Sequence, residues 1–116
     1  MNPGRAVAAF AAISHENRLA IFRLLVKRGP AGLAAGAIAG RLGVAPSSLT
    51  FHLQAMQRAG LLVRTRRGRQ LIYSADFAAM NALVGFLTDH CCVESGADAC
   101  CVPDQVVAPP RRKKVA

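Results

Sequence analysis

The chain has 116 residues, the size of one small domain, and 53% of them are hydrophobic, which is too apolar for a disordered protein. Its net charge of +9, from 15 basic and 6 acidic residues, favours a polyanionic partner, either nucleic acid or an anionic membrane. No apolar run approaches the roughly 18 to 20 residues of a membrane-spanning helix, so the sequence favours nucleic acid.

The first two helices are predicted to form a scaffold. Val7, Phe10 and Ile13 are spaced as one face of an amphipathic helix over roughly Arg5 to Ala12, which favours a packed helix of a cytoplasmic protein over a signal-peptide core. A second helix is expected from Ser14 to the Gly29-Pro30 break. We expect its apolar residues to point inward: Leu19, Ile21, Phe22, Leu24 and Leu25. Its basic residues are expected to form a solvated face or to cap the last turn: Arg23, Lys27 and Arg28.

The segment from Leu33 to Arg58 has the pattern of two short helices joined by a tight turn. Gly43 suits the end of the first helix and Pro46 suits the first turn of the second. The inner stripe of the second helix is Leu49, Leu53 and Met56, and its polar outer face carries Ser47, Ser48, Thr50, Phe51 and Gln54. This arrangement is typical of a DNA-reading helix-turn-helix, although any helical hairpin could share it.

A β-hairpin is predicted directly after this segment. The runs LLVRT and QLIYSA have strand-like composition, and they flank a turn that contains Gly68. Four arginines lie on the hairpin: Arg64, Arg66, Arg67 and Arg69. A charge run is usually a solvated face, but a basic hairpin beside a reading helix is typical of a wing that reaches DNA phosphates or a minor groove.

A last helix is expected to start near Asp76 and to fade between His90 and Cys92. Its apolar stripe is predicted to pack on the first helix and on that helix's counterpart in a second subunit: Met80, Leu83, Val84 and Leu87. We therefore place the DNA-binding and dimerisation domain in residues 1–92. Residues 93–116 are predicted to be a cysteine-containing loop and a basic, disordered tail.

The order of these parts resembles the ArsR/SmtB family of metal-responsive bacterial repressors. The resemblance rests on TFHLQAM at residues 50–56 and on RRGRQLIYS at residues 66–74. It implies a mainly α (α+β) winged helix-turn-helix homodimer with about five helices and a two-stranded wing, which binds operator DNA and releases it when metal binds. It also implies that the protein is not an enzyme and that the start of the reading helix faces the major groove. His52 is expected to be a packed structural residue.

One departure from the family concerns the metal site. Arsenic repressors of the founding type carry a Cys-x-Cys pair in the first helix of the helix-turn-helix, but residues 33–42 contain no cysteine here. Zinc sensors of the family use Asp and His on the last helix. Asp89 and His90 are adjacent here, and adjacent residues of a helix point about 100° apart.

The remaining candidates are Cys91, Cys92, Cys100 and Cys101. Thiolates select soft ions, and As(III) or Sb(III) takes three of them in a pyramid, so three of these four cysteines would suffice. The chain thus looks like the subgroup of arsenic repressors whose site lies at the last helix and the tail, with As(III) or Sb(III) as inducer and no organic cofactor.

Other interpretations of the cysteines remain open. They include a tetrahedral Zn(II) or Cd(II) site, a two-sulfur site for trivalent organoarsenicals, a thiol redox switch, and two disulfides in a secreted protein. The whole chain could instead be an architectural DNA-binding protein with incidental cysteines. A small thiol enzyme is disfavoured because no Cys-x-x-Cys or βαβ pattern is present.

Overall fold

The computed structural model describes residues 1–95, and Cys100, Cys101 and the basic residues 111–114 lie outside this range. The described part forms five helices and three strands. Their bounds are α1 Pro3–Ile13, α2 Glu16–Arg28, β1 Leu33–Ala34, α3 Ala35–Leu42, α4 Pro46–Arg58, β2 Leu62–Arg67, β3 Gln70–Ala75 and α5 Phe77–Thr88. The predicted winged helix-turn-helix is confirmed. The predicted boundary at residue 92 stays a prediction.

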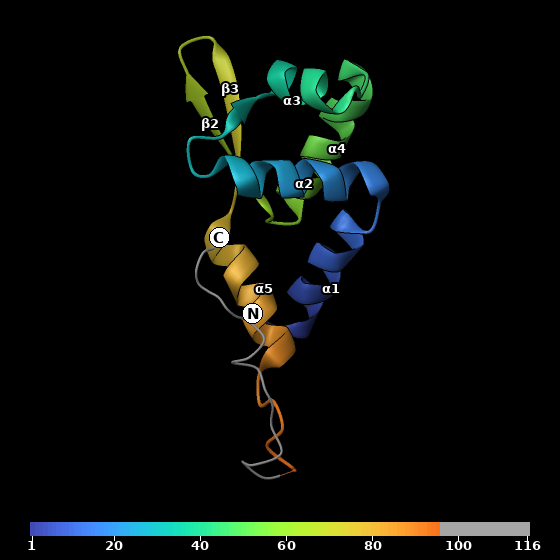
Figure 1. The fold of residues 1–116 in the computed structure, drawn as a ribbon, viewed down its shortest axis with the longest axis vertical. Helices are drawn as coiled ribbons and strands as arrows, with labels where there is room; N and C mark the ends of the chain where they lie inside the picture. The colour runs from blue at the N-terminus through green and yellow to red at the C-terminus, as the bar shows by residue number, and fades with distance from the viewer. Residues whose placement is uncertain (96–116) are drawn as a thin grey trace.

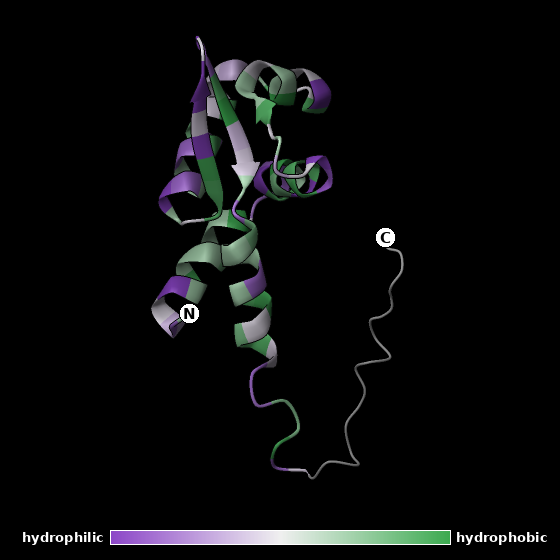
Figure 2. Ribbon diagram, turned by 90° about the vertical axis from the view of Figure 1, so that its left-hand side faces the viewer, coloured by the Kyte–Doolittle hydropathy of each residue, from purple (hydrophilic) through white to green (hydrophobic). Residues whose placement is uncertain are grey.

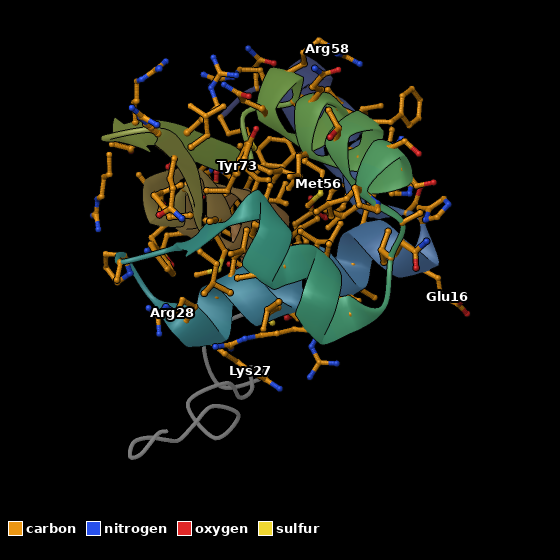
Figure 3. The ribbon with its side chains drawn as sticks, turned by 90° about the horizontal axis from the view of Figure 1, so that it is seen from above. Glu16, Lys27, Arg28, Met56, Arg58 and Tyr73 are labelled. Atoms are coloured by element: carbon orange, nitrogen blue, oxygen red, sulfur yellow. The ribbon has the colours of Figure 1, made fainter. Side chains whose placement is uncertain are left out.

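The molecule has two ends (Figure 1). At one end, α3, α4 and the β2–β3 hairpin surround a core with α2, and at the other end α1 and α5 lie side by side. The most deeply buried large side chains come from α2, α3, α4 and the start of the hairpin: Ile21, Leu25, Ile38, Leu49, Leu53, Met56 and Leu61. In Figure 3, Met56 from α4 and Tyr73 from β3 point into the space between the reading helix and the wing. This packing fixes the wing relative to α4.

The turn between α3 and α4 forms as the sequence predicts. Gly43 has a φ of 66°, the left-handed conformation that glycine adopts without strain, and its N–H donates to the Ala39 carbonyl oxygen. Pro46 occupies the first turn of α4, where a missing N–H costs no hydrogen bond. These two residues set where the reading helix begins.

The wing differs from the prediction in having a third strand. The sheet order is β1-β3-β2 and all pairs are antiparallel, with Leu33 opposite Tyr73 and Arg64 opposite the same Tyr73 from the other side. β2 extends to Arg67, so only Gly68 and Arg69 form the turn. Gly68 has a φ of 62° and Arg69 has no positive φ, which is the pattern of a type II′ hairpin turn.

Two predictions about the first two helices need correction. α1 packs through Ala6, Ala9 and Ala12, which leaves Val7 66% and Phe10 37% exposed. The small alanine side chains allow close approach to the rest of the chain, and the larger residues point outward. The predicted inward position of Leu19 is also wrong: it is 46% exposed, because the buried stripe of α2 runs through Ile21, Phe22 and Leu25.

The last helix also ends earlier than predicted. α5 stops at Thr88, and residues 89–95 form a series of turns in which the Cys91 N–H donates to the Thr88 carbonyl oxygen. Leu83 is the buried residue of this helix, whereas Val84 and Leu87 are exposed. Within residues 1–95, no helix has the length and apolar character needed to cross a bilayer.

Substitution of Gly32 tests how closely the chain just before β1 packs against β3. Its φ is +69°, and a Cβ there would lie 2.5 Å from the Tyr73 carbonyl oxygen. We expect Gly32→Ala to lower the free energy of unfolding by about 2–4 kcal/mol, because it adds both backbone strain and a steric clash. Urea denaturation measures the change. Gly40→Ala is the matched control, since nothing lies within 4 Å of its Cβ, and it should be neutral or stabilising.

Candidate DNA-binding surface and cysteine pair

The outer face of α4 is solvent-exposed along its whole length. Every residue predicted to read DNA on this helix is exposed, with Phe51 at 60%: Ser47, Ser48, Thr50, Phe51 and Gln54. Ser47, Phe51 and Gln54 follow a helical spacing that places them opposite the buried stripe, while Ser48 and Thr50 lie at its flanks. The Thr50 hydroxyl donates to the Pro46 carbonyl oxygen at 3.0 Å, so it is left as an acceptor.

The same face continues to Arg58, which sequence reasoning missed as a candidate. Arg58 follows Gln54 by four residues and is exposed at the far end of α4 (Figure 3). Phe51, Gln54 and Arg58 follow an i, i+3, i+7 spacing, and this spacing was the sequence signal that could have identified Arg58. The exposed surface therefore combines polar, aromatic and cationic groups on one helix.

The wing carries its arginines into solvent on both faces. Arg64 and Arg66 lie on the face of β2 that also carries Leu62, whereas Arg67 lies on the opposite face and Arg69 at the turn. All four are exposed, and the Arg66 Nε donates to the nearby Gly68 carbonyl oxygen at 3.3 Å. Figure 2 shows the hydrophilic colour along β2. These cations are placed to meet an anionic surface.

Carboxylates do not neutralise this surface in the part of the chain that the structure describes. Glu16 lies at the start of α2, Asp76 caps α5, and Asp89 and Glu94 lie beyond α5. Within residues 1–95, the ion pair found is between His90 Nε2 and Asp89 Oδ2, at 3.8 Å and exposed. The positive potential of the wing is therefore not cancelled by acidic groups of residues 1–95.

His52 is the polar residue buried on the inner face of α4, as predicted for a packed histidine. It is 7% exposed, and its Nδ1 accepts a hydrogen bond from Arg18 Nε at 3.0 Å. The His15 ring lies 4.7 Å away between centroids. Burial lowers the pKa of His52 below its ordinary value of 6.5, and the charges of Arg18 and His15 lower it further. His52 is therefore neutral at pH 7.

This pKa shift predicts how stability depends on pH. The unfolded chain binds more protons than the folded one once the pH falls below 6.5, so the folded protein should lose stability as the pH falls through this region. The contribution of His52 should be complete above pH 6.5. Urea denaturation at several pH values measures it, and His52→Gln should have a flatter profile. Identical profiles for the two proteins would contradict the prediction.

The sulfur atoms of Cys91 and Cys92 lie close together, although adjacent side chains of a regular helix point apart. Their Sγ atoms are 3.2 Å apart. Cys92 has a φ of 60° and His90 has a φ of 61°, so two non-glycine residues take the left-handed conformation. This conformation breaks the helical geometry in which adjacent side chains diverge, and the two sulfurs lie within hydrogen-bond distance of each other.

The described cysteines supply two sulfur ligands. In residues 1–95, no group of three or more Cys, His, Asp or Glu side chains is arranged to hold a metal ion. Asp89 and His90 lie beyond α5 rather than on it, so the i, i+3 geometry expected of a zinc sensor on the last helix does not form there. The predicted third ligand, Cys100 or Cys101, lies outside the described residues.

Comparisons with known proteins agree with the geometry. Residues 13–65 match the model of a helix-turn-helix domain. The HTH-type transcriptional regulator YgaV of Escherichia coli is 32% identical over 88 residues, which cover 76% of this chain and 87% of that protein.

Two solved structures share the winged-helix fold. An ArsR-like transcriptional regulator from Rhodococcus sp. RHA1 superposes with a TM-score of 0.67 at 30% identity, covering 79% of this chain and 83% of that one. The homodimeric winged helix-turn-helix DNA-binding domain Mb0332 from Mycobacterium bovis, a possible ArsR-family regulator, gives 0.60 at 29% identity, covering 75% and 81%.

A helix-turn-helix with an exposed polar reading face and a basic wing defines the class of winged-helix transcriptional regulators. Within that class, the chain belongs to the ArsR family.

Proposed function

We propose that this protein is a homodimeric, DNA-binding repressor that As(III) or Sb(III) releases from its operator. The ion would bind Cys91 and Cys92 together with Cys100 or Cys101. The observation that carries the effector assignment is the 3.2 Å separation of the Cys91 and Cys92 sulfurs beside the last helix.

The DNA-binding part of the proposal is supported by the exposed face of α4 and by the wing arginines, which have no carboxylate partner within residues 1–95. In a dimer, two such helices would enter successive major grooves about 34 Å apart. The wing arginines and Arg58 would bind phosphates, and this makes affinity fall steeply with salt. The polar and aromatic residues of α4 would read the bases.

The dimer is supported by apolar side chains at the α1–α5 end that the single chain leaves exposed. Val7 and Phe10 on α1 and Val84 and Leu87 on α5 are 66%, 37%, 57% and 61% exposed. Figure 2 shows green segments along α5. Their burial against a second copy would remove this apolar surface from water, and the Mycobacterium bovis relative is described as a homodimer.

The chemistry of the donor set supports a soft, thiophilic ion. The two groups that lie together after α5 are both cysteine sulfurs, 3.2 Å apart. Thiolate ligands select soft acceptors. When bound, such an ion would supply strong bonds to these thiolates.

Release would follow from the position of the pair. Cys91 lies three residues after Thr88, the last residue of α5, and α5 contacts α1. Binding of a third thiolate to the ion would change the turns that follow α5. This change would alter the packing of α5 at the proposed dimer interface. A coupling of about 1–3 kcal/mol would weaken operator binding about 5- to 150-fold.

Thiol counting tests the effector assignment. The reduced full-length protein would be loaded with arsenite, freed of excess by gel filtration, and assayed for bound arsenic and remaining reactive thiols. Loss of three thiols per arsenic supports the proposal. Loss of two would overturn the three-thiolate site in favour of a two-sulfur site. No bound arsenic, with zinc retained on four thiols, would overturn the proposal in favour of a divalent-metal sensor.

A further inference from the structure

Arg18 stands at the junction of α1, α2 and α4, and the proposed DNA-binding and cysteine sites do not use it. Its Nε donates to His52 Nδ1 at 3.0 Å, and its Nη1 donates to the Ala12 carbonyl oxygen at 3.5 Å. Its Cζ lies 5.6 Å from the centroid of the Phe51 ring. One guanidinium thus links the last turn of α1 to both an inner and an outer residue of the reading helix.

The chemistry of these interactions makes the link rigid. An arginine remains charged and planar, so it holds two hydrogen bonds in a fixed geometry while stacking on an aromatic ring. His52 accepts the bond only when its Nδ1 carries no proton, and the His15 ring packs beside it at 4.7 Å. Phe51 also meets His52 edge-on, at 6.0 Å between ring centroids.

Phe51 is unusual on this face because it is a large apolar side chain that is 60% exposed. An exposed aromatic ring on a helix normally moves between rotamers, and ordering it on binding costs entropy. The Arg18 guanidinium, 5.6 Å from the ring centroid, and the His52 ring, 6.0 Å away between centroids, lie beside it. A ring fixed in this way can contact a thymine methyl group in the major groove.

We propose that Arg18 is a positioning residue for sequence recognition: it fixes the Phe51 ring and the orientation of α4 against α1. This inference rests on the proposed DNA binding. A phosphate-binding arginine strengthens binding to every sequence and adds about 0.9 to the salt slope. A positioning arginine instead raises the ratio of operator to non-operator affinity and leaves the salt slope unchanged.

The first test compares Arg18→Met, which keeps the apolar stem, with Arg23→Met, an exposed arginine on the same helix. Fluorescence anisotropy would use a footprinted fragment of the protein's own promoter and a scrambled duplex at several salt concentrations. We expect Arg18→Met to bind the promoter about tenfold more weakly and to bind the scrambled duplex with unchanged affinity. Arg18→Lys should restore little of the lost promoter affinity, because lysine lacks the planar guanidinium of arginine. A parallel loss on both duplexes with a smaller salt slope would overturn the inference.

Phe51→Leu supplies a second variant, at an exposed position where the substitution should leave the fold intact, and it should itself lower promoter affinity more than affinity for the scrambled duplex. If Arg18 acts through Phe51, Arg18→Met should cost much less in the Phe51→Leu background than in the wild type. Fully additive losses would overturn the coupling. Absence of promoter binding by the wild-type protein would instead overturn the proposed function.

The titration of His52 tests, without DNA, whether Arg18 holds the His52 ring. By NMR, the pKa of His52 should rise toward 6.5 in Arg18→Met, because the variant loses both the nearby positive charge and the hydrogen bond to the neutral ring. Arg23→Met should leave it unchanged. An unchanged His52 titration in Arg18→Met would show that the guanidinium does not hold the ring.

Discussion

Cys91→Ser and Cys92→Ser should each bind promoter DNA as tightly as the wild-type protein and fail to leave it when arsenite is added. Each substitution removes one of the two sulfurs that lie 3.2 Å apart, and a hydroxyl is a poor ligand for a soft ion. Neither side chain lies near α4 or the wing, so DNA affinity should be unchanged. The wild type should lose about 5- to 150-fold in affinity under the same titration.

Val93→Ser is the matched control for this pair. It introduces the same hydroxyl into the same turn at a residue that is 69% exposed, and it leaves the sulfurs in place. Anisotropy on promoter DNA under reducing conditions measures all four proteins. Normal release of Cys91→Ser or Cys92→Ser by arsenite would show that the effector binds elsewhere.

A triple substitution in the wing, with Arg64, Arg66 and Arg67 all changed to Gln, should reduce DNA affinity roughly 100-fold or more at physiological salt. These exposed arginines have no carboxylate partner within residues 1–95, so they are available for phosphates in each subunit of a dimer. The slope of log K against log salt should fall by about 0.9 for every DNA phosphate that the variant no longer neutralises.

The control for the wing variant removes the same charge from another surface. Arg5, Arg23 and Lys27 are exposed on α1 and α2, and Lys27 lies away from α4 in Figure 3. Changing these three to Gln should alter affinity and salt slope far less. Equal losses in the two triple variants would mean that net charge, rather than the wing, governs binding.

The parts of the fold that depend on local chemistry could be predicted from the sequence. Gly43 and Pro46 each restrict the backbone in a way that marks a helix end or start, and α4 begins where they indicate. The strand pattern around Gly68 likewise located the wing. In contrast, β1 has two residues, too few to show any periodicity, and it exists because Leu33 and Ala34 pair with β3.

Sequence patterns could not predict the features that depend on tertiary interactions. The spacing of Val7 and Phe10 predicted an inward face for α1, but hydrophobic periodicity does not distinguish the core of one chain from a surface that a second chain covers. The Arg18–His52 hydrogen bond joins residues 34 positions apart. The left-handed conformation of Cys92, which brings the sulfurs together, has no sequence signal such as glycine.

The proposed function is tested most directly by titrating the wild-type protein on fluorescent DNA from its own promoter, with arsenite and separately with zinc, under reducing conditions. We expect arsenite to release the DNA and zinc to leave it bound. Release by zinc alone, or by neither ion, would contradict a three-thiolate sensor built on Cys91 and Cys92.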